Sequence, residues 1–144
     1  MVRRLVAAAL LVVASVAVGQ TLTNESTQGP KGWISDYKLA RREAERLGLP
    51  IIVHVHASWC GPCQQMERET LGSPDVLQQL GTRFIGLKVD RDEDSELADG
   101  FRVESLPTDI IVAPDGRIVA RRVGYQPRQT YLSTMSYWSG AFTK

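Results

Sequence analysis

Two cysteines, Cys60 and Cys63, are the residues of this chain whose type and spacing could do chemistry. They are separated by Gly61 and Pro62, and they are the only cysteines among the 144 residues. A C-x-x-C pair can exchange a disulfide with another protein or supply two ligands to a metal ion. With two cysteines in all, a four-cysteine zinc site and a framework of structural disulfides are excluded for a monomer.

The cysteine pair is predicted to lie where a strand gives way to a helix. The apolar residues 51–56 precede it, and residues 64–71 are rich in helix formers. A helix N-terminus has unpaired N–H groups and a partial positive charge, and both favour a thiolate over a thiol. We therefore expect Cys60 to be the nucleophile, and Cys63 to attack the mixed disulfide that forms on Cys60.

The residues between and before the cysteines fit this chemistry. Pro62 in the first helical turn costs no hydrogen bond, and Gly61 lets a partner chain approach the sulfur. With Trp59 in front, residues 59–63 read WCGPC. This is the active-site sequence of thioredoxins, so the chain resembles the thioredoxin family.

The remaining elements predict one α/β domain around this pair. Their order is similar to that of the whole thioredoxin fold, which implies a central mixed β-sheet with helices on both faces over about residues 33–142. The expected elements are a helix capped by Ser35 or Asp36 and ended by Gly48, a strand at 51–56, the motif helix, a short helix at 75–80, a strand at 83–90, a short helix through Leu97 and Phe101, a β-hairpin at 109–123, and a final helix burying Tyr131, Leu132, Met135 and Trp138.

Residues before the hairpin match a second family motif. Leu106, Pro107 and Thr108 occupy the place where thioredoxins carry a cis-proline opposite the active site. The resemblance implies that Pro107 is cis and packs against the cysteine pair, and that the Leu106 backbone pairs with an extended substrate segment. The substrate-binding residues that it implies are Trp59, Gly61, Pro62, Leu106, Pro107 and Thr108.

Two histidines mark a departure from cytoplasmic thioredoxins. His54 stands where that family has a buried aspartate, and Gly86 stands where it has the facing lysine. His54 is therefore a candidate catalytic base for Cys63, or it simply fills space beneath that cysteine. His56 replaces a conventional tryptophan. Because His54 and His56 share one face of a strand near two thiolates, Cu(I) handling is an alternative function.

The N-terminus is predicted to be a cleaved signal peptide. Arg3 and Arg4 precede an uninterrupted small and apolar run over residues 5–18. As a helix this run would span roughly 21 Å, short of the roughly 30 Å hydrocarbon core, so cleavage near Gly19 is favoured over an anchor. We expect residues 1–19 to be the signal peptide, 20–32 a flexible leader and 33–144 the thioredoxin-like domain.

The overall charge gives no reason to expect binding to nucleic acid or to a membrane surface. The formal net charge is +1, and without Arg3 and Arg4 the 15 basic residues face 16 acidic ones. Membrane contact is expected only through the signal peptide. Within the superfamily, residues 66–76 and the turn at 114–116 resemble secreted domains such as the C-terminal domain of the bacterial thiol reductant DsbD.

These features predict a secreted or periplasmic thiol–disulfide oxidoreductase that reduces rather than oxidises protein disulfides. The expected partners are protein thiols and disulfides together with an unidentified electron donor, and the expected state is a monomer. No cofactor is expected beyond the Cys60–Cys63 dithiol, and no metal. Besides Cu(I) handling, a non-catalytic binding module of the same fold is the other alternative.

Overall fold

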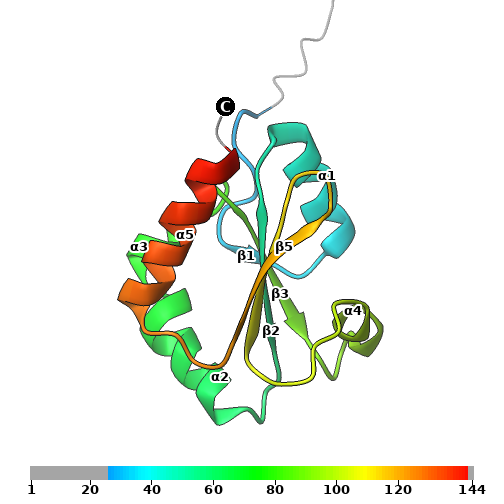
Figure 1. Cartoon of the computed structure of the whole chain (residues 1–144), viewed down its shortest axis with the longest axis vertical. Helices are drawn as coiled ribbons and strands as arrows, with labels where there is room; N and C mark the ends of the chain where they lie inside the picture. Colours follow the sequence, from blue (N-terminus) through cyan, green and yellow to red (C-terminus); the bar gives the residue numbers. More distant parts are fainter. Residues whose placement is uncertain (1–25, 143–144) are drawn as a thin grey trace, which may run out of the picture.

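A five-stranded mixed β-sheet forms the centre of the structure, which is a computed structural model that describes residues 26–142 (Figure 1). The strands are β1 (Trp33–Ile34), β2 (Ile51–His56), β3 (Ile85–Asp90), β4 (Thr108–Val112) and β5 (Ile118–Val123). Their order across the sheet is β1-β3-β2-β4-β5. Strands β1, β3 and β2 are parallel to one another, whereas β4 is antiparallel to β2 and β5 is antiparallel to β4. The predicted mixed sheet is therefore confirmed.

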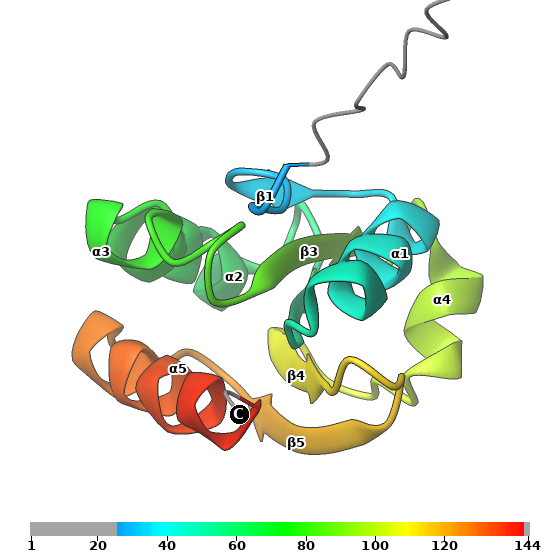
Figure 2. The same cartoon turned by 90° about the horizontal axis from the view of Figure 1, so that it is seen from above.

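Helices cover both faces of this sheet, as Figure 2 shows from above. Helices α1 (Tyr37–Leu47) and α4 (Ser95–Gly100) lie on one side. The other side carries α2 (Gly61–Met66), the π-helical turn η1 (Glu67–Leu71), α3 (Pro74–Leu77) and α5 (Arg128–Phe142). The α/β thioredoxin fold expected from the order of elements is thus present.

The sheet separates two apolar cores. Strand β2 contributes to both, because its side chains alternate between the faces of the sheet. Val53 and Val55 pack into the core under α1 and α4. Ile52 packs into the opposite core with Met66 and Leu71 from α2 and η1. His54, two residues after Ile52, therefore points toward the α2 layer.

Local signals explain the ends of helix α1. The Asp36 side chain caps its N-terminus by accepting a hydrogen bond from the Leu39 N–H at 2.9 Å, so the structure selects Asp36 over Ser35. Gly48 follows the helix with φ of 66°, a left-handed conformation that glycine adopts without a steric penalty. The predicted helix and its stop at Gly48 are confirmed.

The motif helix is less regular than its sequence predicts. After Met66 the helix widens into the π-helical turn η1, in which the Gly72 N–H bonds to the Glu67 carbonyl five residues earlier at 3.0 Å. The following helix α3 covers only Pro74–Leu77 instead of residues 75–80. Intrinsic helix propensity cannot distinguish an α-turn from a π-turn, because the residues that favour one also favour the other.

Strand β1 was not predicted, because two residues are too few for a periodic pattern. It pairs with the edge of β3, and the Trp33 indole N–H donates to the Leu71 carbonyl at 3.2 Å. The predicted signal peptide, residues 1–19, lies outside the described residues, as does the first part of the predicted leader. Within residues 26–142, no helix is long and apolar enough to cross a membrane.

Candidate active site

Cys60 and Cys63 form a disulfide at the start of α2. Cys60 is the N-cap residue of that helix, and its sulfur accepts a hydrogen bond from the Cys63 N–H at 3.2 Å. Cys60 is 5% exposed and Cys63 is 1% exposed. The strand, the tight turn and the helix start therefore bring both sulfurs together, with Cys60 as the outer one.

A hollow of about 360 Å³ opens beside Cys60. Its walls include four of the predicted substrate-binding residues, namely Trp59, Gly61, Pro62 and Leu106. The indole of Trp59 is 68% exposed at its rim. The charged part of the lining comes from Arg91, Asp92 and Glu104. A peptide segment that enters this hollow would reach Cys60 first.

The other two predicted substrate-binding residues, Pro107 and Thr108, are buried and do not line this hollow. The Leu106–Pro107 peptide bond is cis. Leu106 packs against the small apolar cluster that contains both cysteines. The Thr108 hydroxyl donates to the Ser105 carbonyl at 2.6 Å. Pro107 and Thr108 thus shape the loop that presents Leu106.

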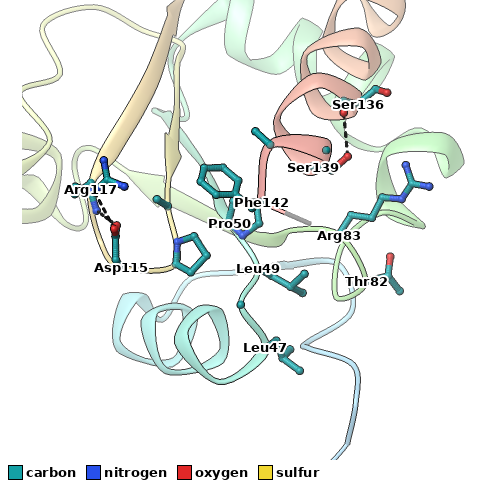
Figure 3. Close-up of a pocket in the computed structure, with 15 residues that line it drawn as sticks. Leu47, Leu49, Pro50, Thr82, Arg83, Asp115, Arg117, Ser136, Ser139 and Phe142 are labelled. Carbon is teal, nitrogen blue, oxygen red and sulfur yellow. Dashed lines mark hydrogen bonds and ion pairs between the residues drawn. The ribbon is translucent and has the colours of Figure 1, made fainter. Parts of the chain in front are cut away.

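A larger hollow of about 1060 Å³ lies at the opposite end of the strands (Figure 3). Residues 47–50, 113–115 and 139–142 contribute to its lining. Residues 47–50 precede β2 and residues 113–115 follow β4, whereas the cysteines follow the end of β2. The hollow is larger, but it is remote from the redox pair, so the chemistry belongs to the smaller one.

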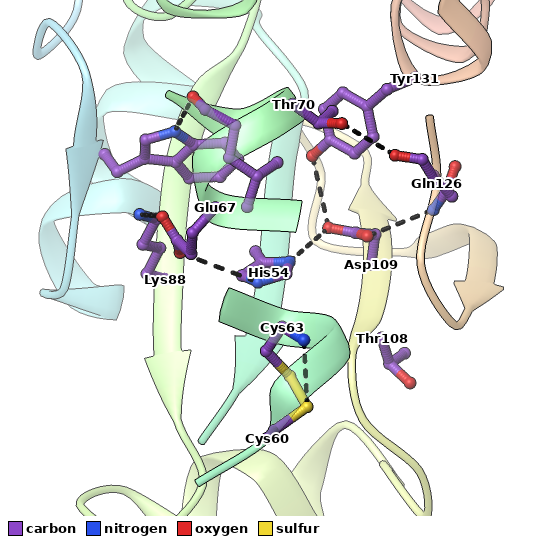
Figure 4. A network of polar contacts seen from close by, with 12 residues as sticks. His54, Cys60, Cys63, Glu67, Thr70, Lys88, Thr108, Asp109, Gln126 and Tyr131 are labelled. Atoms are coloured by element: carbon purple, nitrogen blue, oxygen red, sulfur yellow. Dashed lines mark hydrogen bonds and ion pairs between the residues drawn. A yellow bond between two sulfur atoms is a disulfide. The ribbon is translucent and has the colours of Figure 1, made fainter. Parts of the chain in front are cut away.

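A buried polar network lies beneath the α2 layer (Figure 4). His54 is fully buried, and its Nδ1 lies 3.0 Å from Oδ1 of Asp109, which is 4% exposed. The Tyr131 hydroxyl donates to Asp109 Oδ1 at 3.3 Å, and the Gln126 amide donates to Oδ2 at 3.2 Å. Burial and the neighbouring Asp109 charge raise the pKa of Tyr131 well above its usual value, so its hydroxyl stays a donor.

An ion pair flanks the other side of His54. Lys88 Nζ lies 2.5 Å from Glu67 Oε2, and Glu67 Oε1 lies 3.9 Å from His54 Nε2. Lys88 also lies over the Trp33 ring, 5.5 Å from its centroid. Cytoplasmic thioredoxins have an aspartate–lysine pair at the positions of His54 and Gly86, and neither of these two residues can form it. A different pair, Glu67 and Lys88, lies close to His54 instead.

Sequence reasoning missed Asp109, Glu67 and Lys88. Each of Asp109 and Lys88 interrupts an otherwise apolar strand, which is the signal that could have identified them. Strand register then aligns them, because His54 is paired with Lys88 on β3 and with Asp109 on β4. The side chains of Lys88, His54 and Asp109 therefore form a polar row across the sheet, on the face that α2 covers.

His56 is half-buried and stacks on His54, with ring centroids 5.6 Å apart. Desolvation by burial lowers the pKa of His56, and the charge of His54 lowers it further. Within residues 26–142, no cluster of three or more His, Cys, Asp or Glu side chains could hold a metal ion. His54 Nδ1 is directed at Asp109, so that nitrogen is not available to a metal ion.

Comparisons with known proteins agree with this geometry. A family model described as a thioredoxin-like domain matches residues 37–139. Thioredoxin H2-1 of rice is 40% identical over 77 residues, which cover 51% of this chain and 50% of the rice protein. Thioredoxin of Bacillus subtilis is 35% identical over 79 residues, covering 55% of this chain and 72% of that protein.

Solved structures show the same fold. A thioredoxin from Thermus thermophilus superposes with a TM-score of 0.66 at 32% identity, covering 75% of this chain and 86% of that chain. The DsbH oxidoreductase superposes with a TM-score of 0.64, covering 86% of this chain and 96% of that chain. Its identity is 21%, so it supports the fold alone.

Proposed function

Since the chain belongs to the thioredoxin-like domain family and is a thiol–disulfide oxidoreductase, we propose that it works outside the cytoplasm and reduces disulfides of other proteins. The observation that carries the proposal is the Cys60–Cys63 disulfide at a helix start beside an open hollow. The substrate is a protein disulfide in an accessible, extended segment. The electron donor is a second dithiol, which returns the pair to its reduced form.

Cys60 carries out the first step of this reaction. The Cys63 N–H that bonds to its sulfur also stabilises negative charge there, which favours the thiolate. The Cys60 thiolate attacks one sulfur of the substrate disulfide, a mixed disulfide forms, and the other substrate sulfur leaves as a thiolate. Cys63 then attacks Cys60, releases the second substrate thiolate and forms the Cys60–Cys63 disulfide, so two electrons have moved to the substrate.

Two features support the reducing direction. Gly61 and Pro62 are the intervening pair of the reducing members that the chain resembles, and several relatives at 35% identity or more are thioredoxins. The test is the reduction potential of the Cys60–Cys63 couple in equilibrium with glutathione. A potential of about −270 mV, as in thioredoxin, supports a role as a reductant. A potential of about −120 mV, as in DsbA, would make the protein an oxidant.

The extracytoplasmic location rests on the sequence of the first 20 residues, with Arg3 and Arg4 before the apolar run. The narrower resemblance to the C-terminal domain of DsbD is consistent with it. Fractionation of the producing cell followed by mass spectrometry should find a mature chain that begins close to Gln20. An intact Met1 in the soluble cytoplasmic fraction would contradict the proposed location without affecting the proposed chemistry.

A further inference from the structure

We propose that Asp109 is a positioning residue that holds His54 in the tautomer whose Nε2 is free to take the proton of Cys63. The inference rests on the proposed function, because it concerns the step in which Cys63 resolves the mixed disulfide. It assigns a role to a carboxylate on β4, a strand that contributes neither cysteine.

The contact with Asp109 fixes the tautomer of His54. Nδ1 faces Asp109 Oδ1 at 3.0 Å, and a carboxylate can only accept hydrogen bonds. The ring nitrogen on that side must therefore carry the proton. In a neutral imidazole the other nitrogen, Nε2, is then an acceptor. Hydrogen bonds from Tyr131 and Gln126 hold the Asp109 carboxylate in place for this role.

The other ring nitrogen of His54, Nε2, is buried and has no hydrogen-bond partner among residues 26–142. Buried polar atoms are nearly always paired, so an unpaired one needs an explanation. Glu67 Oε1 lies 3.9 Å from Nε2, which is too far for a hydrogen bond. The Cys63 thiol carries a proton only in the reduced or mixed-disulfide state. Nε2 can accept that proton, which explains why it has no partner when the disulfide is formed.

Cys63 lies on the side of His54 that faces Glu67. Cys63 and Glu67 are four residues apart on one helical face, and the Glu67 N–H bonds to the Cys63 carbonyl. Glu67 is the carboxylate near Nε2, so this face of α2 and η1 covers His54. Figure 4 shows the His54 ring between Glu67 and Asp109, with the disulfide next to it along the strand direction.

The resulting step balances in atoms and charge. The Cys63 thiol gives its proton to His54 Nε2, and its thiolate attacks Cys60 in the mixed disulfide. The bond between Cys60 and the substrate sulfur breaks, and the substrate leaves as a thiolate that takes a proton from His54 or water. Both cysteine sulfurs end oxidised, and the substrate sulfur ends reduced.

The charges around His54 favour the proton in transit. Asp109 on β4 and Glu67 on η1 flank the ring, and both stabilise an imidazolium. Lys88 on β3 opposes them, but it is paired with Glu67. His56 on β2 stacks on the ring, and the Tyr131 hydroxyl on α5 reaches Asp109 Oδ1.

The test uses Asp109→Asn, whose side-chain amide can donate to Nδ1 and so permit the opposite tautomer. Reduced full-length protein is mixed with a dithiobis-nitrobenzoate reagent, which releases one coloured thiolate when Cys60 reacts and a second when Cys63 resolves. We expect the second release near pH 7 to slow about 100-fold in the variant. Asp115→Asn, the same charge change in an exposed hairpin turn, is the matched control.

A second measurement does not depend on the rate. The chain has two histidines, so a His56→Gln background leaves one imidazole for nitrogen NMR. In the His56→Gln protein we expect the neutral His54 ring to carry its proton on Nδ1. When Asp109→Asn is added, we expect a substantial fraction of the molecules to carry it on Nε2. An Nε2-protonated ring in the parent background overturns the proposal, even if Asp109→Asn fails to fold.

The outcomes separate this inference from the proposed function. If the first thiolate is released normally and the second is unaffected by Asp109→Asn, disulfide exchange stands and the role of Asp109 is wrong. If Cys60 does not react and insulin is not reduced, the proposed function itself fails. Equal slowing in Asp115→Asn would also overturn the inference, because the effect would then come from net charge.

Discussion

The indole of Trp59 donates a hydrogen bond to the carboxylate of Asp92, with 2.8 Å between Nε1 and Oδ2. Trp59 directly precedes Cys60, and Asp92 follows the end of β3. Both residues line the hollow beside Cys60. A large side chain that is 68% exposed would otherwise sample several rotamers, so Asp92 holds one wall of the hollow in place.

Removing this hydrogen bond should weaken substrate capture. We expect Asp92→Ala to lower kcat/KM for insulin reduction about fivefold, mainly through KM, which corresponds to roughly 1 kcal/mol for a hydrogen bond at the surface. Glu93→Ala removes the exposed neighbouring carboxylate and serves as the control. Equal losses in the two variants would show that charge, and not the Trp59 contact, controls capture.

The two sulfurs should behave differently when each is trapped. Cys63→Ser leaves the outer nucleophile but removes the resolving thiol, so mixed disulfides with partner proteins should accumulate. Cys60→Ser should accumulate roughly tenfold fewer, because Cys63 is 1% exposed and a partner cannot reach it. Non-reducing gels of extracts treated with acid to quench exchange measure both. Similar yields would mean that Cys60 is not the only nucleophile.

Two glycines should respond to alanine in opposite directions. Gly81 has φ of 82°, and an added Cβ would lie 2.7 Å from the Gly29 carbonyl oxygen and 2.8 Å from that of Pro30. We expect Gly81→Ala to lower the free energy of unfolding by about 1–3 kcal/mol. Gly140 lies in α5 with nothing within 4 Å of an added Cβ, so Gly140→Ala should raise it by up to about 1 kcal/mol. Urea titration measures both; an unchanged Gly81→Ala would contradict the predicted clash.

The stability of the protein should depend on pH through His56. Burial lowers the pKa of this residue below 6.5 in the folded state, so the unfolded chain binds protons more readily than the folded one as pH falls. The stabilisation that neutral His56 contributes to the folded state is therefore complete above about pH 6.5. It is lost as the pH decreases through the lowered pKa that His56 has in the folded protein. In His56→Gln, the free energy of unfolding should fall less between about pH 7 and 5 than in the parent. Identical slopes would place His56 in a fully solvated environment.

The sequence by itself determined the redox pair, the order of most elements and the family. These depend on short-range patterns: the C-x-x-C spacing, a polar cap at Ser35 or Asp36 and the Gly48 stop of α1, and the apolar run of β2. Each is encoded within a few residues, so one chain is enough to read it. The same patterns pointed to His54, although they left its role open.

Only the tertiary structure decided what surrounds His54. Asp109 lies 55 residues further along the chain and Lys88 lies on a third strand, and strand register alone places them beside the histidine. A shift of one residue in either pairing would turn these side chains to the other face of the sheet. Register depends on how two whole apolar faces pack against α1 and α2, so it is a property of the assembled core and not of any local segment.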